Sequence, residues 1–330
     1  MTGVQTCALP IYKVRSGVPL ASSDLPLFLA QDKGYFKAEN LDVEAVHFGA
    51  GPQMVAPLAT GDLDVGGGTG SAAFYNAADR KIDIRIVSAR SAMAKGYRFQ
   101  TIVIRKDHVE SGRFKGYADL KGMRIALPAA GIGTVAVMDG LAKRGGFQYG
   151  DIEQVYLAFA QIVAGMAGKA IDGAIMVEPY GSMVHGAGTG VIFDTTQDVF
   201  PDEEISFVFF GDKFARERPD VGRRYMKAIL RGMRDYNDAV TDGRWNNSPA
   251  ADDVVRLLSK ATNSTEAQIR ASFPHFAHPD GRINLEPMKK ILATFKSLGL
   301  VTSPTVTVED RKSTRLNSSH IPLYRMPSSA

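Results

Sequence analysis

The residues best suited to hold a small ligand lie in five short segments, each between the end of a β-rich run and the start of a helical one. These segments are rich in glycine, serine and threonine, or open with a carboxylate, at residues 21–26, 48–53, 66–71, 128–134 and 178–180. Glycine lets backbone N–H groups approach a ligand, and the first turn of a helix offers N–H donors without partners. Several such ends converging on one cleft would hold an anion without any lysine. The alternative for any single segment is a tight turn that serves packing alone.

Aromatic and acidic side chains near these segments suggest further contacts. Tyr97, Phe159 and Tyr180 would sandwich an apolar part of a ligand, or else pack in the core. Glu178 opens a helix, so its carboxylate either caps that helix or meets an amine or N–H group of a ligand.

One glycine pattern resembles a cofactor motif but lacks its partner. The sequence G-I-G-T-V-A at residues 131–136 matches one form of the dinucleotide fingerprint. That motif needs an acid at the end of the next strand, where it binds the ribose. Asp151 and Glu153 instead precede the next predicted strand, so a nicotinamide site is not expected.

The chain predicts neither a metal site nor any cofactor. His275, His278 and Asp280 form the cluster closest to a metal site, and we interpret it as a surface loop. The only cysteine is Cys7, near the start of the chain, so the body has no disulfide, no thiolate nucleophile and no cysteine metal ligand.

From residue 14 onward, β-rich runs alternate with helical segments, which predicts an α/β fold of largely parallel sheets covered by helices. The predicted strands are residues 14–19, 42–47, 63–66, 82–88, 100–105, 123–127, 154–157, 174–177, 191–193 and 205–210. The predicted helices begin near residues 26, 52, 71, 134, 161 and 179, and later ones span 219–240, 249–261, 265–272 and 285–298. Alternation first and helices last indicate two α/β lobes, one of which carries a helical cap.

An internal match supports two equivalent lobes. Residues 53–64 align with residues 161–172 at an offset of 108, with Gln, Val, Ala, Ala and Asp in register. Each copy runs from a helix through a turn towards a short strand. The alternative is a chance match between alanine-rich helices. If the match is real, the two lobes face each other with equivalent loops, and these loops define a cleft.

Composition and charge describe an ordinary globular protein. Of the 330 residues, 45% are apolar and 22% are charged, and no apolar run approaches the ~20 residues of a membrane span. The net charge of +4 comes from residues 311–330, which hold four basic residues and no acid. The remaining 35 basic residues face 35 acids, so no nucleic-acid surface is predicted.

The two ends of the chain differ from its body. Residues 1–12 and 311–330 resemble translated sequencing-adaptor read-through, and we expect both to be non-native tails. Residues 1–12 lack the basic start and long apolar core of a signal peptide, so we expect that the native signal peptide is missing.

Several motifs of the body resemble one protein family. They are V-R-S-G-V-P at residues 14–19, A-x-x-K-G-Y-F-x-x-E at 30–39, L-x-x-G-x-x-D at 58–64 and E-P at 178–179. Together they resemble the nitrate/sulfonate/taurine-type substrate-binding proteins of ABC importers, a family that also includes binders of thiamine pyrimidine precursors. The resemblance runs from about residue 14 to 310. Its motifs are specific to the superfamily but do not identify a ligand.

The resemblance implies the type II periplasmic binding protein fold, in which two α/β lobes joined by two crossovers close over the ligand by hinge motion. Lobe I would comprise residues 13–92 and 192–310, including the helical cap, and lobe II residues 93–191. The last family helix, after about residue 309, is replaced here by the expected tail, which we expect to lower stability. The resemblance, together with Phe159 and Tyr180 from the residues above, gives the expected ligand residues: Ser22, Ser23, Asp24, Gly51, Gln53, Thr69, Gly70, Ser71, Tyr97, Gly133, Thr134, Phe159, Glu178 and Tyr180.

The implied function is that of a receptor, which binds a ligand and catalyses nothing. It would capture a small organic anion or aromatic heterocycle and deliver it to an ABC permease in the inner membrane. We expect a monomer, free in the periplasm or lipid-anchored outside the cytoplasm, with no nucleic-acid partner.

Two alternatives remain open. Thiamine-pyrimidine synthases share the fold, but that branch carries a cysteine-rich motif and a reactive histidine. Here the body has no cysteine and the five segments hold no histidine, the nearest being His47. A sensory ligand-binding domain is the second alternative.

Overall fold

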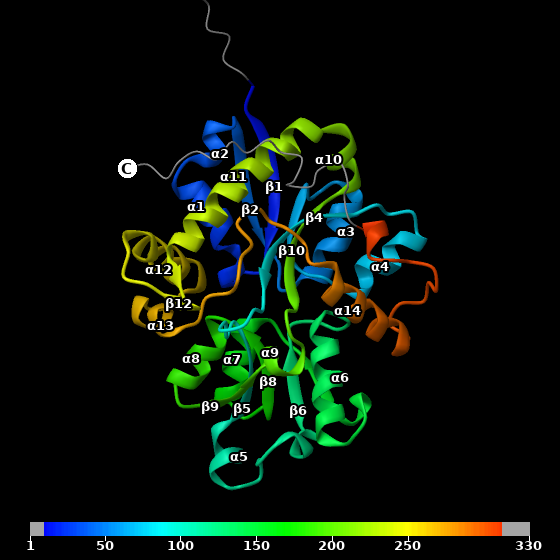
Figure 1. Cartoon of the computed structure of the whole chain (residues 1–330), viewed down its shortest axis with the longest axis vertical. Coiled ribbons are helices and arrows are strands. Elements are labelled where there is room, and N and C mark those ends of the chain that lie inside the picture. Colours follow the sequence, from blue (N-terminus) through cyan, green and yellow to red (C-terminus); the bar gives the residue numbers. More distant parts are fainter. Residues whose placement is uncertain (1–9, 312–330) are drawn as a thin grey trace, which may run out of the picture.

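A computed structural model describes residues 10–311 and divides them between two five-stranded sheets and the helices that cover them. Figure 1 shows the two lobes one above the other. Most of the two expected tails, residues 1–9 and 312–330, lies outside the described residues. In the part of the chain that is described, no helix is long and apolar enough to cross a bilayer.

The first sheet forms the core of the upper lobe in Figure 1. Its strands are β1 (Tyr12–Val18), β2 (Leu41–His47), β3 (Val65–Thr69), β4 (Arg85–Ala92) and β10 (Glu204–Phe210), in the order β2-β1-β3-β10-β4. β1 is parallel to β2 and β3, whereas β10 is antiparallel to β3 and β4. Tyr12, the last residue of the expected first tail, already pairs with Leu41.

The second sheet repeats this arrangement. Its strands are β5 (Gln100–Arg105), β6 (Arg124–Leu127), β7 (Glu153–Tyr156), β8 (Gly173–Val177) and β9 (Gly190–Thr195), in the order β7-β6-β8-β5-β9. β6 is parallel to β7 and β8, whereas β5 is antiparallel to β8 and β9. β5 and β8 are buried along their whole length, as expected for central strands with both faces covered.

The expectation of largely parallel sheets is therefore correct, with one antiparallel strand in each. The exceptions, β10 and β5, are the strands that follow a crossover from the other sheet. The chain leaves each sheet at the strand ends that face the other lobe, and it enters the next sheet at the strand ends that face the first. The first strand after each crossover therefore runs opposite to its neighbours.

The boundary expected between residues 191 and 192 falls inside β9. This strand pairs with β5 as far as Thr195, so all of it belongs to the second sheet. The β-rich run in this region holds no turn residue to show which sheet it joins. The two crossovers between the sheets are residues 93–99 and 196–203.

Helices cover both sheets, and ten of them lie at expected segments. They are α1 (Leu25–Asp32), α3 (Val55–Thr60), α4 (Ala72–Asp79), α6 (Thr134–Gly145), α7 (Phe159–Ala167), α8 (Tyr180–Gly186), α11 (Pro219–Asp238), α12 (Pro249–Thr262), α13 (Glu266–Ala271) and α14 (Leu285–Ser297). Unpredicted short elements are α2 (Tyr35–Ala38), α5 (Lys106–Glu110), α9 (Thr196–Val199), α10 (Asp212–Glu217) and the hairpin of β11 (Val240–Thr241) and β12 (Arg244–Trp245). The unpredicted helices have four to six residues, too few for a helical period to show.

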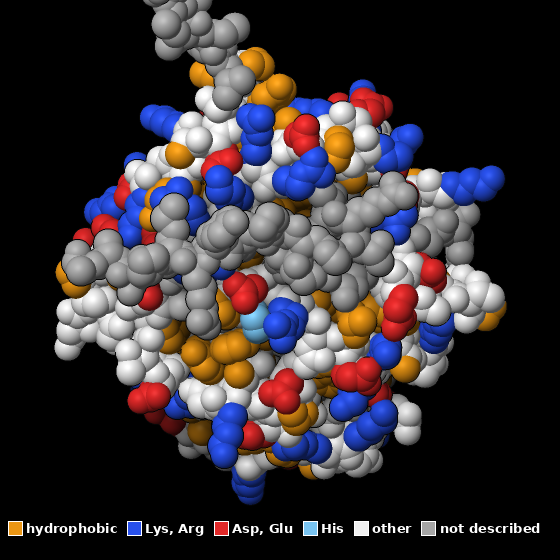
Figure 2. All heavy atoms as spheres, turned by 45° about the horizontal axis from the view of Figure 1, so that its top comes forward, with side chains coloured by type: hydrophobic (Ala, Val, Ile, Leu, Met, Phe, Trp, Pro, Cys, Tyr) orange, Lys and Arg blue, Asp and Glu red, His pale blue; other side chains and the backbone are white. Residues whose placement is uncertain are grey.

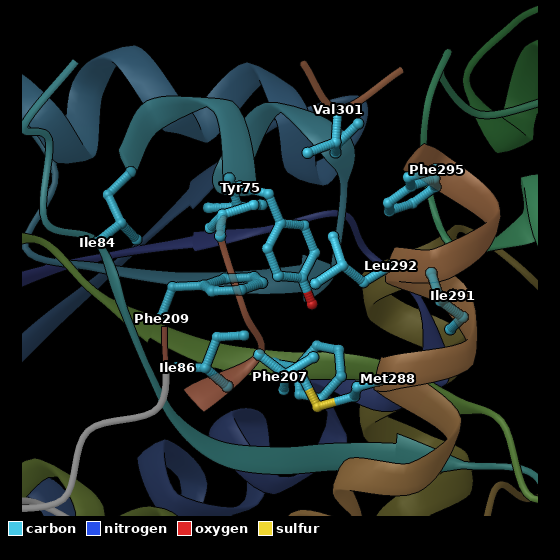
Figure 3. Close-up of a cluster of buried hydrophobic side chains, with 14 of the residues drawn as sticks. Tyr75, Ile84, Ile86, Phe207, Phe209, Met288, Ile291, Leu292, Phe295 and Val301 are labelled. Atoms are coloured by element: carbon cyan, nitrogen blue, oxygen red, sulfur yellow. The ribbon is translucent and has the colours of Figure 1, made fainter. Parts of the chain in front are cut away.

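The C-terminal helix α14 packs against the first sheet. Met288, Leu292 and Phe295 belong to a buried cluster in which Phe74 stacks on Phe209 at 4.1 Å. Figure 3 shows the α14 side chains facing aromatic and aliphatic side chains of the sheet and of α4. The same cluster includes Val135 from α6 of the other lobe. The last helix thus joins the two lobes beside the cleft.

The internal match corresponds to equivalent positions in the two lobes. Residues 53–64 contain α3 and lead into β3, and residues 161–172 contain most of α7 and lead into β8. β3 and β8 hold the same place in the two strand orders.

The aspartate at the end of each copy accepts the same kind of hydrogen bond, from the backbone N–H of an arginine in the neighbouring strand. Asp64 Oδ2 accepts the backbone N–H of Arg15 at 3.0 Å, and Asp172 Oδ2 accepts that of Arg124 at 3.0 Å. Each bond ties the start of one strand to its parallel neighbour. This shared detail favours a true repeat over a chance match.

Candidate ligand site between the lobes

A small cavity lies where the loops of the two lobes meet. Its walls combine strand ends, helix starts and both crossover regions: Pro19, Ala21, Ser23, Ala50, Gly51, Gly68, Thr69, Phe99, Pro128, Ile132, Phe159, Val177, Ile205 and Ser206. None of these fourteen lining residues is charged. The cavity holds about 20 Å³, which is room for a single water molecule. The lobes are therefore closed on each other.

Two reciprocal backbone hydrogen bonds close the lobes. The N–H of Ala72, in the first turn of α4, donates to the carbonyl of Gly131 at 2.8 Å. The N–H of Gly133, just before α6, donates to the carbonyl of Gly70 at 3.0 Å. In this closed form, each lobe thus uses donors at the start of its helix to bind the other lobe.

A second pair of bonds joins the lobes on the α1 side of the cavity. The N–H of Ser22 donates to the carbonyl of Glu178 at 3.3 Å, and the Tyr180 hydroxyl donates to the carbonyl of Leu20 at 2.8 Å. Glu178 and Tyr180 were expected to contact a ligand, and in the closed form both take part in lobe contact.

The loop after β1 is held from behind by a buried cation. Arg90 donates to the carbonyl of Ser23 at 2.8 Å and forms an ion pair with Asp24, whose other carboxylate oxygen accepts the N–H of Ala21. Arg90 is 6% exposed and Asp24 is completely buried. Asp24 therefore shapes the loop, while Ser23 lines the cavity.

Close backbone packing explains one glycine of the second loop. A β-carbon on Gly51 would lie 2.8 Å from the carbonyl oxygen of Thr69, so any larger residue would push the loop away from β3. Gly51 and Thr69 both line the cavity. Gln53 lies on the exposed side of the same loop, where its Oε1 accepts the N–H of Gly49 at 2.8 Å.

Aromatic rings form the apolar wall of the site. Phe159 lines the cavity and stacks on Tyr180, with ring centres 5.1 Å apart and planes within 14°. Tyr97 lies outside the lining residues and meets Phe276 edge-on at 5.6 Å. Phe99, two residues further along the same crossover, contributes the second aromatic wall.

Glu178 caps the helix that it precedes. Its carboxylate accepts the backbone N–H of Ser182 at 3.1 Å and the hydroxyl of Ser182 at 3.0 Å. Burial raises the pKa of Glu178 to about 8, so its carboxyl is mostly protonated at neutral pH. It therefore places little negative charge beside the cavity.

Glu203 is a buried acid that the sequence did not bring to attention. It is completely buried at the end of the second crossover, and neither carboxyl oxygen has a hydrogen-bond partner among the described residues. One oxygen lies 3.4 Å from the place of a β-carbon on Gly133. Burial raises the pKa of Glu203 to about 8. Its one sequence signal is an acid directly before the apolar strand β10.

Several expected hydroxyl groups gather at this junction. Those of Ser22 and Ser71 are buried and have no hydrogen-bond partner among the described residues, and Ser71 forms an antiparallel bridge with Ile132 across the lobes. Thr134 is buried in the first turn of α6. Polar groups without partners at a lobe junction are typical of a site that meets another molecule.

The loop expected around His275, His278 and Asp280 lies between α13 and α14, and Asp280 is exposed, but His275 is buried. His275 is 1% exposed and stacks on Tyr236 at 4.2 Å. Burial lowers the pKa of His275 to about 3, so its ring is neutral. Apolar neighbours on both sides, Phe273 and Phe276, are the signal for burial that the interpretation as a loop overlooked. Among the described residues, no group of three histidine, cysteine or acidic side chains is placed to hold a metal ion.

Solved structures share this two-lobed arrangement. The alkanesulfonate-binding protein of Xanthomonas axonopodis pv. citri, solved with MOPS, aligns with a TM-score of 0.69 at 17% identity, over 92% of this chain and 99% of that one. The nitrate-binding protein of Synechocystis PCC 6803 aligns with a TM-score of 0.71 at 15% identity, over 91% and 84%. A desulfurization enzyme also aligns, with a TM-score of 0.61 at 14% identity, over 93% and 98%. The fold is that of the type II periplasmic binding proteins.

Sequence similarity then assigns the family. The model of the NMT1-like family matches residues 11–242, more than half of the chain, so the chain belongs to this family. A protein of Brucella abortus, provisionally named a binding protein, is 26% identical over 244 residues, which cover 73% of this chain and 70% of that protein.

Proposed function

We propose that the protein is the solute-binding receptor of an ABC importer and that it captures a small organic anion or an aromatic heterocycle between its lobes. The observation that carries this proposal is the interlobe cavity, whose walls come from the loops of both lobes, from Phe99 of the first crossover and from the start of β10, directly after the second crossover. Closing such a cavity removes a ligand from water on all sides, so a bound ligand favours the closed form.

The walls of the cavity favour a particular ligand chemistry. Phe99 and Phe159 offer a flat or apolar body two faces, and the hydroxyls of Ser23 and Thr69 offer hydrogen bonds. Helix starts at α4 and α6 supply backbone donors for an oxyanion, once opening of the lobes releases them. The lining has no charged side chain, so recognition would rest on hydrogen bonds rather than on an ion pair.

The same lining favours a receptor over an enzyme. A desulfurization enzyme shares the fold, so the fold alone does not decide. Hydrolytic or acid–base chemistry requires a nucleophile next to a base, and the fourteen lining residues include no histidine, cysteine, lysine or acid. Three serine and threonine hydroxyls without a base would bind a ligand rather than attack it.

We further propose that the receptor works outside the cytoplasm with an inner-membrane permease as its partner. This part of the proposal rests on the family and on structural relatives named as sulfonate- and nitrate-binding proteins. Delivery requires the lobes to reopen, which the two crossovers permit by hinge motion.

A thermal-shift panel tests the proposed ligand class. Alkyl and aryl sulfonates, taurine, nitrate, pyrimidines and aromatic acids would be compared, with NAD as a negative control. A true ligand at ~100 times its Kd stabilises the fold by about 2.7 kcal/mol, which raises the melting temperature by several degrees. We expect a selective shift with one class of anion or heterocycle.

Variants then assign the shift to the cavity. Phe159→Ala and Thr69→Val should each weaken binding of the selected ligand by about tenfold or more. Thr60→Val, on the exposed end of α3, is the matched control and should bind normally. Binding that survives both cavity variants, or selective binding of a metal ion or a sugar, would exclude the proposed site or its ligand class.

A further inference from the structure

A larger cavity lies on the hinge, separate from the site between the lobes. It measures about 440 Å³, within the range of small-molecule sites. Its walls come from the end of β4, both crossovers and the segment between α13 and α14: Ala89, Arg90, Ser91, Ala92, Met93, Ala94, Asp202, Glu204, Phe276, His278, Arg282, Ile283, Asn284 and Leu285. None of these residues lines the interlobe cavity.

One buried acid in this wall lacks a partner. Glu204 is 5% exposed, and its Oε1 accepts the backbone N–H of Asn284 at 2.8 Å. Its Oε2 is buried with no hydrogen-bond partner among the described residues. Glu204 therefore has one unused acceptor oxygen next to the cavity, buried beneath its wall.

The hinge cavity has other ionisable side chains in its wall, which would bind a further polar group of the same ligand. Asp202 and Arg282 are exposed, and Arg282 forms no ion pair within residues 10–311. His278 Nδ1 accepts the N–H of Asp280 at 3.2 Å, which leaves the N–H on Nε2. Arg90 is already paired with Asp24. The wall thus offers two acids, Asp202 on the second crossover and Glu204 directly after it, and one cation unpaired among the described residues, Arg282, on the opposite segment. Asp202 Oδ1 also accepts a bond from Gln197 at 3.4 Å.

Apolar side chains fill the space between these polar groups. Met93, Phe276, Ile283 and Leu285 supply an aromatic and aliphatic surface. Figure 2 shows one face of the molecule, on which acidic, basic and hydrophobic side chains are intermixed.

We propose that the hinge cavity binds an amphoteric small molecule, which carries a cationic N–H-bearing group (the head), an anionic group (the tail) and an apolar body. The head binds Glu204 and Asp202, the body packs on Met93 and Phe276, and the tail meets Arg282. Glu204 and Asp202 belong to the second crossover and its end, so an occupant touches a segment that joins the lobes. This site is independent of the ligand proposed for the interlobe cavity.

Three probes that differ only in charged groups test the proposal on the full chain. They are phenylalanine, which carries both charges, phenethylamine, which carries the head, and 3-phenylpropanoate, which carries the tail. We expect millimolar or tighter binding by ligand-observed NMR, with phenylalanine binding most tightly. Glu204→Gln should weaken phenylalanine and phenethylamine by about tenfold and leave 3-phenylpropanoate unchanged. Arg282→Gln should weaken phenylalanine and 3-phenylpropanoate only.

Controls separate this site from the interlobe cavity and from misfolding. Glu217→Gln, an exposed acid of α10, should bind all three probes normally. Ala94→Leu narrows the hinge cavity without changing a charged residue and should also weaken phenylalanine binding. Phe159→Ala should leave phenylalanine binding intact even if it abolishes binding of the interlobe ligand. The proposal is overturned if no probe binds, if the affinity pattern ignores both charge variants, or if Phe159→Ala removes the binding.

Discussion

Two completely buried glutamates at the lobe junction differ in what surrounds their carboxyl groups. Glu178 has two bonds from Ser182, whereas Glu203 has no hydrogen-bond partner among the described residues. Burial without partners favours the neutral acid, because an isolated buried charge is far more costly than a neutral carboxyl. Glu203 therefore makes the stability of the fold depend on pH, and no hydrogen bond among the described residues offsets the cost of burying its carboxyl group.

We expect Glu203→Gln to stabilise the protein in a pH-dependent way. Burial raises the pKa of Glu203 from 4.5 to about 8. Between these pH values the unfolded chain releases a proton that the folded chain retains, so the free energy of unfolding falls as pH rises, by about 1.4 kcal/mol per unit at most. Glutamine has no such proton, so the advantage of the variant should grow from pH 4.5 to 8 and then level off.

Urea unfolding across this pH range measures the difference. Glu217→Gln, an exposed acid, should follow the wild-type profile throughout. Parallel profiles for Glu203→Gln and wild type would show that Glu203 ionises normally in the folded protein.

At the scale of elements, the two lobes use the same aspartate in different surroundings. Asp64 ties β3 to β1 and pairs with Arg218, at 19% side-chain exposure. Asp172 ties β8 to β6 at 6% side-chain exposure and also accepts from His108 and Arg105. Burial by itself raises the pKa of Asp172, but its bonds with Arg124 and His108 outweigh this and hold the pKa well below its ordinary value.

We therefore expect Asp172→Asn to destabilise more than Asp64→Asn. Asparagine keeps one acceptor oxygen but carries no charge, so Arg105 and Arg124 lose the buried carboxylate with which they form ion pairs, at a cost of about 3 kcal/mol. The more exposed Asp64 should cost about 1 kcal/mol. Urea unfolding of both variants at neutral pH compares them directly. Equal losses would indicate that the strand tie, which both share, outweighs the additional buried partners.

Element patterns also explain what the sequence could and could not predict. Every strand of both sheets lies at or near a predicted run, because alternation and β-branched residues are local signals. The antiparallel direction of β5 and β10 is not local, since it depends on which sheet the chain enters. The same limit applies to the cavity: Thr69 and Phe159 follow recognisable strand ends, whereas Phe99 and Ser206 reach it only through the path of the crossovers.

At the scale of the whole molecule, closure rests on contacts from separate loops. The hydrogen bonds at the starts of α4 and α6 lie on one side of the interlobe cavity, and those of Ser22 and Tyr180 lie on its α1 side. All four bonds join one lobe directly to the other. The cavity of about 20 Å³ is too small for a sulfonate, so a ligand must enter by opening the lobes and must hold them slightly further apart.

A disulfide across the lobes should report closure. Ser71 and Ile132 form an antiparallel bridge, which places their α-carbons roughly 4.5 to 5.5 Å apart, within the reach of a disulfide. Ser71→Cys with Ile132→Cys, in a Cys7→Ser background, should oxidise to an intramolecular disulfide, visible as a mobility shift on non-reducing gels. The oxidised protein should lose binding of the interlobe ligand and recover it on reduction. Binding unaffected by oxidation would place the ligand elsewhere.

The return of β10 to the first sheet has a consequence for synthesis on the ribosome. The second sheet is built from residues 100–195 without interruption, whereas the first needs a strand that begins at Glu204. β4, at the edge of the first sheet, pairs only with β10 and must wait for it. We therefore expect the lobe that starts later in the chain to finish folding first, while the half-built first sheet waits with its strand edge open to chaperones.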